Sequence, residues 1–433
     1  MSQDRLSSSR RLSRRRALQG SVAAAAAAGA LPRAAAAPVH NQHQEVLRVG
    51  LVGCGGRGTG AAVNALRADP NAQLVALGDA FGDMLERSLQ SLLAQADIAP
   101  RVQVDENHRF LGFDAYRRVV DSVDVVLLAT SPHFRPEHMR YAVEQGRHLF
   151  VEKPVAVDAR GVRSVMESGA KAAEKGLCVV SGLCYRYQFA KQETIRRIHD
   201  GAIGEPVALQ CSYNTGGLWH RGDKPEWSRM EYMMRNWLYF TWLSGDHIAE
   251  QHIHSLDKLL WAMGDVPPLR ATASGGRIAR TDPKYGNVYD HFNTVFEWEN
   301  GVRGFSSCRQ IPGAAADVSD WVFGTRGVAG IQHHTIRSEQ GRWRYRGEGP
   351  DDMYQNEHDA LFAAIRSGEP INNTDYMCKS TLMAILGRMA AYTGRTLSWD
   401  EVWNSELDLS PPAYDWIDFE PDPVAVPGVT PFV

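Results

Sequence analysis

Short apolar runs alternate with helical patterns through the first 200 residues of the chain. Runs of four to seven mostly apolar residues are typical of strands that are buried on both faces of a parallel sheet. They lie at residues 46–52, 72–77, 123–129 and 148–151, and a further run lies at 177–181. Helical patterns separate them at residues 59–68, 136–145 and 161–175. This order predicts consecutive βαβ units, and hence a parallel sheet with helices on both faces.

The rest of the chain mixes strand patterns with further helical ones. We expect strands at residues 208–213, 294–298 and 301–307, and helices at 193–200, 356–367 and 379–393. Between residues 237 and 264, apolar side chains recur at near-helical spacing from Ile248 to Leu260. Because Gly264 then supplies a stop signal, this pattern predicts one helix that ends there.

The composition is that of an ordinary globular protein. The chain has 433 residues, 44% of them apolar, and a formal net charge of -3, which excludes collagen-like, coiled-coil and largely disordered classes. A net charge near zero also argues against a nucleic-acid-binding protein, which needs a concentrated basic face. Six cysteines are too few for a disulfide scaffold, and no C-x-x-C pair is present, so we expect buried free thiols.

The first 37 residues differ in charge from the rest. They hold seven arginines and one aspartate, and an alanine-rich apolar run at 21–31 precedes small residues at 34–37. This is the order of an export signal, and the pair Arg14 and Arg15 resembles that of a twin-arginine (Tat) signal, with Ala17 where that motif has Phe. No later stretch has about 18 consecutive apolar residues. We therefore expect a periplasmic or exported protein without membrane contact after signal removal, which would leave 40 basic and 49 acidic residues and a net charge of -9.

A glycine-rich loop comes directly after the first expected strand. Gly53-Cys54-Gly55-Gly56-Arg57-Gly58 fits the pattern G-x-G-x-x-G between a strand and a helix. The first glycine permits the tight turn, the second lets backbone N–H groups approach a pyrophosphate, and the third allows close helix–strand packing. Asp79 ends the next strand 21 residues later, where a carboxylate accepts hydrogen bonds from the adenosine ribose. No Lys or Arg follows it closely, so the sequence favours NAD over NADP. Because the Tat route exports folded proteins, we expect this NAD to be held tightly.

Two further motifs lie after the strand at 123–129. The first is Ala129-Thr130-Ser131-Pro132, and the second is Glu152-Lys153-Pro154, about 100 residues after the glycine loop. With His138 and the run at 148–151, they resemble the glucose–fructose oxidoreductase, inositol dehydrogenase and rhizopine-catabolism family (Gfo/Idh/MocA), over about residues 46–395. The resemblance implies that Lys153 lies at the nicotinamide and the substrate, that Glu152 contacts the cofactor ribose and that Pro154 follows a cis peptide. By its own chemistry, a lysine there can hydrogen-bond a substrate hydroxyl and polarise a proton transfer.

The expected cofactor site thus combines the glycine loop with the carboxyl ends of several strands. Its residues are Gly53, Gly55, Gly56, Arg57, Gly58, Asp79, Thr130, Ser131, His133, Glu152, Lys153 and Pro154.

The same resemblance implies a fold and a division into domains. The segment at 182–187, with Arg186, matches the place where family members leave the nucleotide domain, and the junction at 201–206 is also typical of the family. We expect an α/β protein with a Rossmann doubly wound parallel sheet, followed by an α+β domain with a large, mostly antiparallel sheet. The predicted parts are a signal at 1–37, an NAD-binding domain at 46–180, a substrate-binding domain at 181–395 and an extended Pro-rich tail at 396–433. Relatives are commonly dimers or tetramers, so a homodimer or homotetramer is expected.

A polar motif within residues 237–264 resembles the family pattern Asp-x-x-x-His-x-x-Asp. It places Glu250 at the first acid, His254 at the histidine and Asp257 at the second acid. In the family, that histidine takes the hydroxyl proton while hydride leaves the same carbon, a role that suits a neutral imidazole. On one helix, the i, i+4 spacing would put Glu250 and His254 on one face. Lys153, His254 and Glu250 are the predicted catalytic residues, and Glu250 and His252 depart from the family's usual Asp and Gly.

The same segment leaves a metal site open as an alternative. Five metal-capable side chains occur within nine residues, and pairs at i, i+3 and i, i+4 spacing could share an ion. They are Asp246, His247, Glu250, His252 and His254. We favour a site without metal, because no H-E-x-x-H motif is present.

The expected substrate contacts are polar and aromatic, as a sugar requires. They are Tyr185, Arg186, Arg235, Asn236, Trp237, His252 and Asp257, with Trp219, His220, Tyr239 and His291 as further candidates.

Three functions remain as hypotheses. The first is an NAD-dependent oxidoreductase that acts on a CH–OH group of a small carbohydrate, cyclitol or glycoside. The second is a redox-assisted glycosidase or lyase, which oxidises a ring carbon transiently and regenerates NAD in place. The third is a nucleotide-bound sensor without turnover, which the presence of both Lys153 and His254 disfavours.

Overall fold

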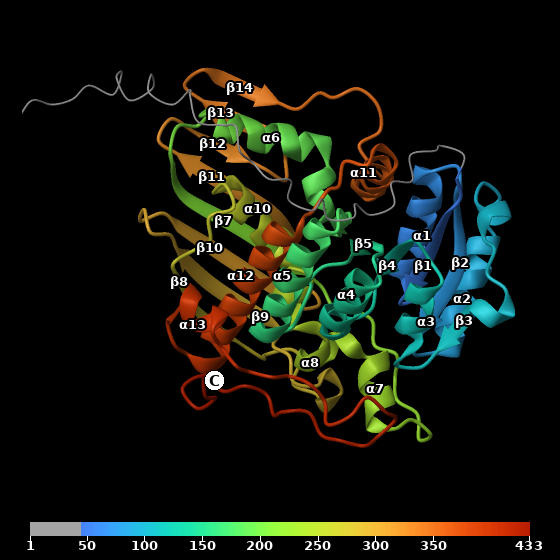
Figure 1. Cartoon of the computed structure of the whole chain (residues 1–433). Coiled ribbons are helices and arrows are strands. Elements are labelled where there is room, and N and C mark those ends of the chain that lie inside the picture. The colour runs from blue at the N-terminus through green and yellow to red at the C-terminus, as the bar shows by residue number, and fades with distance from the viewer. Residues whose placement is uncertain (1–44) are drawn as a thin grey trace, which may run out of the picture. The chain divides into compact units, whose positions relative to one another are not determined.

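The first sheet is built by the N-terminal part of the described chain. The computed structural model describes residues 45–433, so the predicted signal at 1–37 lies outside it. Six parallel strands have the order β3-β2-β1-β4-β5-β6 (Figure 1). They are β1 (Leu47–Val52), β2 (Ala72–Asp79), β3 (Arg109–Leu111), β4 (Val125–Leu128), β5 (His148–Val151) and β6 (Val179–Ser181). This is the Rossmann order, with its switch point between β1 and β4, and it confirms the predicted parallel sheet.

Helices cover both faces of this sheet. One face packs against α1 (Gly56–Ala68) and α2 (Gly82–Leu93), and the other against α3 (Ala115–Asp121), α4 (Arg135–Glu144) and α5 (Ala159–Glu174). The helix α11 (Met353–Ser367), from much later in the chain, packs beside α1. Its Leu361 shares a buried core with Leu51 and Phe150. A helix of the C-terminal half therefore completes the core of the N-terminal sheet.

The second sheet has nine strands in the order β14-β13-β12-β11-β7-β10-β9-β8-β15. The pair β7–β10 is parallel and the other pairs are antiparallel, which confirms the predicted α+β part. The strands are β7 (Pro206–Thr215), β8 (Arg270–Gly276), β9 (His291–Glu297), β10 (Arg303–Gln310), β11 (Asp317–Gly324), β12 (Gly327–Gly330), β13 (Thr335–Ser338), β14 (Gly341–Arg344) and β15 (Leu397–Ser398).

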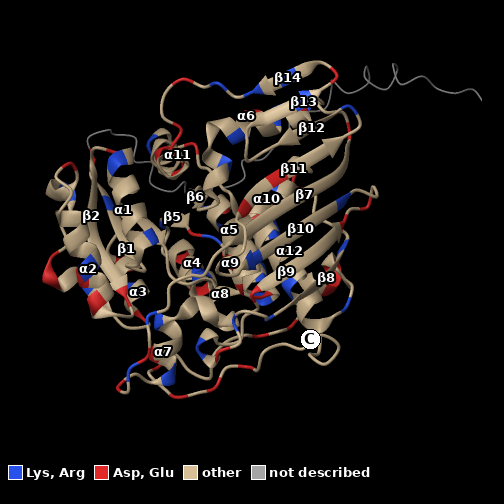
Figure 2. Ribbon diagram, turned by 180° about the vertical axis from the view of Figure 1, so that it is seen from behind, with Lys and Arg blue, Asp and Glu red and all other residues tan. Residues whose placement is uncertain are grey.

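One face of this second sheet is covered by helices (Figure 2). The helices of this part are α6 (Phe189–His199), α7 (Arg229–Arg235), α8 (Thr241–Ser244), α9 (His247–Glu250), α10 (Ile253–Ala262), α12 (Thr374–Thr393) and α13 (Trp399–Trp403). Apolar side chains of α10 and α12 pack on residues of β7, β9 and β11 in one continuous core. The six cysteines are buried free thiols, as expected. Within residues 45–433, no helix combines the length and the apolar character needed to cross a bilayer.

The single helix predicted between residues 237 and 264 is wrong. The segment forms a 3₁₀ turn and then the three separate helices α8, α9 and α10. Gly245 has a φ of 73° and ends α8, and Asp246 has a φ of 69° and turns the chain into α9. A second irregular step at Gln251 separates α9 from α10. Glu250 and His254 therefore belong to different helices, and the i, i+4 relation assumed for them does not hold.

Candidate functional site

The glycine loop has two glycines that the fold requires and two that leave space. A Cβ on Gly53, whose φ is 95°, would lie 2.6 Å from the backbone nitrogen of Thr130, and a Cβ on Gly58 would lie 2.0 Å from the Gly53 carbonyl oxygen. Gly55 and Gly56, at the start of α1, have no atom within 4 Å of the Cβ position. The open volume thus lies at a helix N-terminus, where backbone N–H groups and the helix dipole favour a phosphate.

A cavity of about 830 Å³ opens at this loop, within the range of roughly 300–1,000 Å³ typical of ligand sites. Eight of the predicted cofactor residues line it: Gly53, Gly55, Gly56, Arg57, Gly58, Asp79, Thr130 and Ser131. The Asp79 carboxylate accepts hydrogen bonds from the backbone N–H groups of Cys54 at 2.6 Å and Phe81 at 2.9 Å. These bonds fix the carboxylate at the end of β2, while burial raises its pKa. The residues present therefore fit a dinucleotide.

Arg57 of the glycine loop lies close to two carboxyl groups. Its Nε lies 2.8 Å from Oε1 of Glu152, which comes directly after β5, and its Nη2 lies 3.8 Å from Oε1 of Glu357 in α11. Both glutamates are buried, and burial together with the Glu152 charge raises the pKa of Glu357 well above its usual range. Arg57 thereby connects the glycine loop to the residue that precedes Lys153.

The structure brings Lys153 and Glu250 together. The Lys153 ammonium donates hydrogen bonds to Oε1 of Glu250 at 2.9 Å and to the Glu250 backbone carbonyl. The two side chains are only 13% and 15% exposed, so solvent weakens this ion pair little. The Lys153–Pro154 peptide is cis, as the family resemblance implied. A lysine from the first sheet is thus oriented by a carboxylate at the end of α9.

His254, in the first turn of α10, lies among cationic groups. Burial lowers its pKa well below 6.5, and the ammonium groups of Lys153, Lys258 and Lys191 lower it further. Its ring stacks edge to face on Tyr185, with the ring centroids 5.2 Å apart. The imidazole is therefore neutral at physiological pH, in the form that can accept a proton.

Of the lysines beside His254, Lys258 has an acidic partner and Lys191 has a neutral one. The Lys258 ammonium is fully buried and forms an ion pair with Asp320. Lys191 is 1% exposed and donates to Oε1 of Gln188 at 2.5 Å, and burial lowers its pKa to about 7. The aromatic ring of Tyr185 lies close to both ammonium groups, 4.3 Å from Lys191 and 4.5 Å from Lys258.

Arg186 and Asp257 do not form the predicted substrate contact. Both are buried, and the Arg186 guanidinium donates to both oxygens of Asp257 at 2.8–3.1 Å and to Asp265 at 2.6 Å and 3.1 Å. Ser380 donates a further hydrogen bond to Asp257 at 2.7 Å. Since these bonds occupy the groups that would bind a sugar, the pair fixes α10 to its neighbours instead.

Two more predictions of substrate contact are corrected by burial. His252 is completely buried, with Nε2 at 2.6 Å from Oγ of Ser306. Asn236 is also completely buried, and its amide bonds the backbone of Gly222 and Tyr232. Arg235 and Trp237 line the cavity at the glycine loop, and their contact with a substrate stays a prediction.

His133, another predicted cofactor residue, forms a hydrogen bond with the C-terminal tail. Its Nε2 lies 2.9 Å from the Tyr414 hydroxyl, and burial lowers its pKa to about 4.

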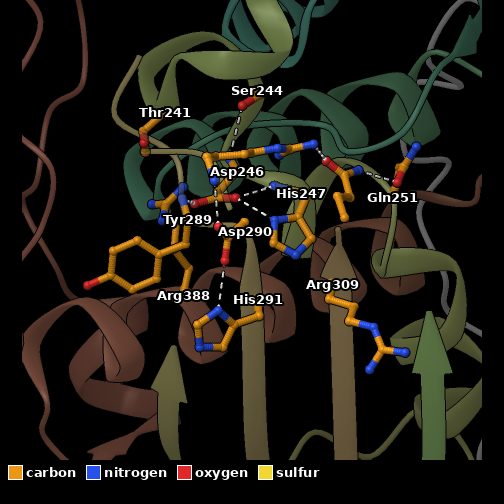
Figure 3. A network of polar contacts seen from close by, with 12 residues as sticks. Thr241, Ser244, Asp246, His247, Gln251, Tyr289, Asp290, His291, Arg309 and Arg388 are labelled. Carbon is orange, nitrogen blue, oxygen red and sulfur yellow. Dashed lines mark hydrogen bonds and ion pairs between the residues drawn. The ribbon is translucent and has the colours of Figure 1, made fainter. Parts of the chain in front are cut away.

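A polar network that sequence reasoning missed fixes the start of the helix that carries Glu250 (Figure 3). The completely buried Asp246 carboxylate accepts hydrogen bonds from His247 Nδ1 at 2.9 Å, from the Tyr289 backbone at 2.7 Å and from the Tyr392 hydroxyl at 2.5 Å. With φ 69° and ψ 165°, Asp246 adopts a conformation that costs about 1–3 kcal/mol for a residue other than glycine. The adjacent Gly245-Asp246-His247 was the available signal, because an acid after a glycine can cap a new helix.

The metal alternative for this segment finds no geometric support. In residues 45–433, no three His, Cys, Asp or Glu side chains are grouped so that they could hold an ion. Asp246, His247 and His252 face protein partners in the network and the core.

Two family profiles match the chain. Residues 47–183 match the oxidoreductase family with an NAD-binding Rossmann fold, and residues 192–329 match the C-terminal domain of the same Gfo/Idh/MocA group. The two regions together make up more than half of the chain.

Individual relatives are distant. The chain is 25% identical over 308 residues to the scyllo-inositol 2-dehydrogenase (NAD(+)) of Bacillus subtilis, which covers 69% of this chain and 79% of that protein. It is 27% identical over 274 residues to glycosyl hydrolase family 109 protein 4 of Phocaeicola vulgatus. That match covers 59% of this chain and 50% of the relative. The chain spans about half the length of most of the curated relatives it matches. The scyllo-inositol dehydrogenase of Lactobacillus casei solved with NAD(H) and scyllo-inositol shares the fold, with a TM-score of 0.62 at 17% identity over 82% of this chain and 100% of that one.

The loop glycines give a matched pair of substitutions. Gly55→Ala places its Cβ in open space at a φ of -71°, so the free energy of unfolding should change by less than about 0.5 kcal/mol, while NAD binding is lost to a clash with the pyrophosphate. Gly58→Ala forces its Cβ against the Gly53 carbonyl and should cost about 1–3 kcal/mol of stability. Urea denaturation and calorimetric titration with NAD measure the two quantities. Unchanged NAD affinity in a folded Gly55→Ala variant would contradict the assigned phosphate position.

Proposed function

This chain belongs to the Gfo/Idh/MocA family of oxidoreductases, and we propose that it transfers hydride between a hydroxyl-bearing carbon of a sugar, cyclitol or glycoside and a tightly bound NAD(H). The contact between Lys153 and Glu250 beside the neutral His254 carries this proposal. The names of the relatives support the substrate class, because they include dehydrogenases of inositols.

In the proposed reaction the protein handles the hydroxyl proton. Lys153 donates a hydrogen bond to the substrate oxygen, and Glu250 keeps its ammonium group in place. The His254 imidazole accepts the proton of that hydroxyl as the carbon is oxidised. NAD, when bound, supplies the hydride acceptor at its nicotinamide. In the reverse direction the imidazolium returns the proton to the oxygen.

A second function, hydrolysis or elimination of a glycoside with NAD regenerated in place, is favoured by the similarity to family 109 glycosyl hydrolases. The two functions share the oxidation step and differ in the steps that come after it. Net formation of NADH from added NAD marks the dehydrogenase, and release of the aglycone without net NADH marks the glycosidase.

The purified protein should release NAD on denaturation and should oxidise inositols or sugars with added NAD. Lys153→Met and His254→Ala should each lower kcat by about 10²–10⁴-fold, the usual contribution of a general acid or base. Lys379→Met and His333→Ala are matched controls. Lys379 is half-buried and pairs with Asp375, His333 is exposed beside Trp321, and both variants should keep the wild-type kcat. Near-wild-type rates in both site variants would refute the assignment, and bound NAD without turnover of any carbohydrate would favour the sensor.

The pH dependence tests the state of His254. Because its pKa is lowered below 6.5, the imidazole gains a proton only when the pH falls through that lower value. The base should therefore stay active between about pH 7 and about pH 6, and kcat/KM for oxidation should decline only in more acidic solution. A decline centred at or above pH 6.5 that disappears in His254→Ala would contradict this arrangement.

We also propose export through the Tat pathway to the periplasm, with the signal at residues 1–37. Replacing Arg14 and Arg15 by lysine should leave the precursor in the cytoplasm, while the same change at Arg10 and Arg11 should not. Cell fractionation and immunoblotting measure the distribution, and equal export of both variants would contradict the proposal. The homodimer or homotetramer expected from the resemblance stays a prediction, which analytical ultracentrifugation measures.

A further inference from the structure

The outer wall of the dinucleotide cavity comes from outside the Rossmann sheet. The glycine loop and the residues after β2 and β4 form the inner wall, as in any such fold. The cavity is also lined by side chains from one segment of the second part of the chain: Trp219, Arg221, Lys224, Trp227, Met234, Arg235 and Trp237. A Rossmann domain alone would leave this side open to solvent.

Arg235 connects this outer wall to the inner one. At the end of α7, its guanidinium forms an ion pair with Asp83 of α2 at 3.2 Å and lies 4.1 Å from the ring centroid of Phe81. Glu231, one turn earlier in α7, holds the same guanidinium at 2.8 Å. Phe81 lies two residues after Asp79, so the connection is made at the adenosine end of the cavity.

The C-terminal tail reaches the same place. The centroid of the Trp416 ring lies 5.3 Å from that of Phe81 and 4.9 Å from that of Phe113. The Tyr414 hydroxyl forms a hydrogen bond with His133. Phe81 therefore has the Arg235 guanidinium and the Trp416 ring as neighbours. In Figure 1 the tail runs along the lower edge of the molecule to α7.

The tail is also fastened to α7. The backbone N–H of Met230 donates to the Ile417 carbonyl at 3.0 Å, and the backbone N–H of Arg229 donates to the Asp418 carboxylate at 2.7 Å. Ile417 and Phe419 pack against the buried cluster that contains Met230. We call α7 together with residues 414–419 the clasp.

We propose that the clasp closes over the adenosine half of NAD and slows its release, so that one dinucleotide stays with the protein through many turnovers. This inference rests on the NAD chemistry of the proposed function. Release would require the Arg235–Asp83 ion pair, the cation–π contact and the aromatic contacts of Trp416 to separate. The aromatic and cation–π contacts are each worth about two- to tenfold in an equilibrium, and because α7 and the tail are joined they must open together.

The rate of NADH release tests the clasp directly. Protein loaded with NADH is mixed with excess NAD, and the loss of bound-NADH fluorescence gives the rate constant. Arg235→Gln and Trp416→Ala should each speed release by roughly three- to tenfold, and Trp416→Phe should restore a slow rate because it keeps a stacking ring. Asp83→Asn removes the ion pair but keeps the cation–π contact, so it should speed release less than Arg235→Gln, and the double variant should be no faster than Arg235→Gln alone.

Two controls separate the clasp from general damage. Arg140→Gln removes an arginine with similar ion pairs on α4, away from the cavity, and Val429→Ala changes a side chain of the same tail that is 76% exposed. Both should release NADH at the wild-type rate. Wild-type protein that binds no NADH at all would overturn the proposed function, whereas bound NADH that leaves all clasp variants at the wild-type rate would overturn the clasp alone.

Discussion

The hydrogen-bonded ion pair between Lys153 and Glu250 is the contact on which the candidate site depends. It joins the end of β5, in the Rossmann sheet, to the end of α9, in the second part of the chain. Both side chains are partly buried, so each charge gains from the other what it loses in hydration. The strained turn at Asp246 acts in the same direction, since it begins α9 and so sets where Glu250 lies. The turn at Asp246 and the Lys153–Glu250 ion pair together fix the position of the candidate catalytic groups between the two sheets.

The sequence predicted those features that local patterns determine. The strand at β1, the glycine loop and Asp79 at the end of β2 were all recognisable, because a buried strand, a tight turn and a phosphate site require particular residue types at fixed spacing. The breaks on the two sides of α9 were not predicted. The apolar side chains at residues 248–260 keep a helical period across the second break, and the first break, at Gly245 and Asp246, lies before this run. The Asp246 carboxylate interrupts the helix, and its partners Tyr289 and Tyr392 are distant in sequence.

Polar residues near a family motif proved the hardest to assign. Arg186 and Asp257 were expected at the substrate, yet each satisfies the other, and only the pairing of distant segments reveals this. Arg235 and Trp237 were also expected at the substrate, and the structure places them in the wall of the cavity at the glycine loop, where α7 is anchored beside the tail. In both cases the residue type indicated a polar contact, but the sequence did not show which group the residue contacts. The same limit hid the ammonium groups that surround His254, since Lys191 reaches it from α6.

The position of the closing residues in the chain has a consequence for assembly. The strands and the loop that form the inner wall of the cavity lie within the first half of the sequence, whereas Trp416 comes 235 residues after the end of β6. Translation adds about 5–20 residues per second, and N-terminal units fold first. The nascent chain therefore spends on the order of ten seconds or more between completing β6 and making Trp416. The residues that the proposed clasp adds from the tail are therefore synthesised well after the glycine loop that would bind the phosphates.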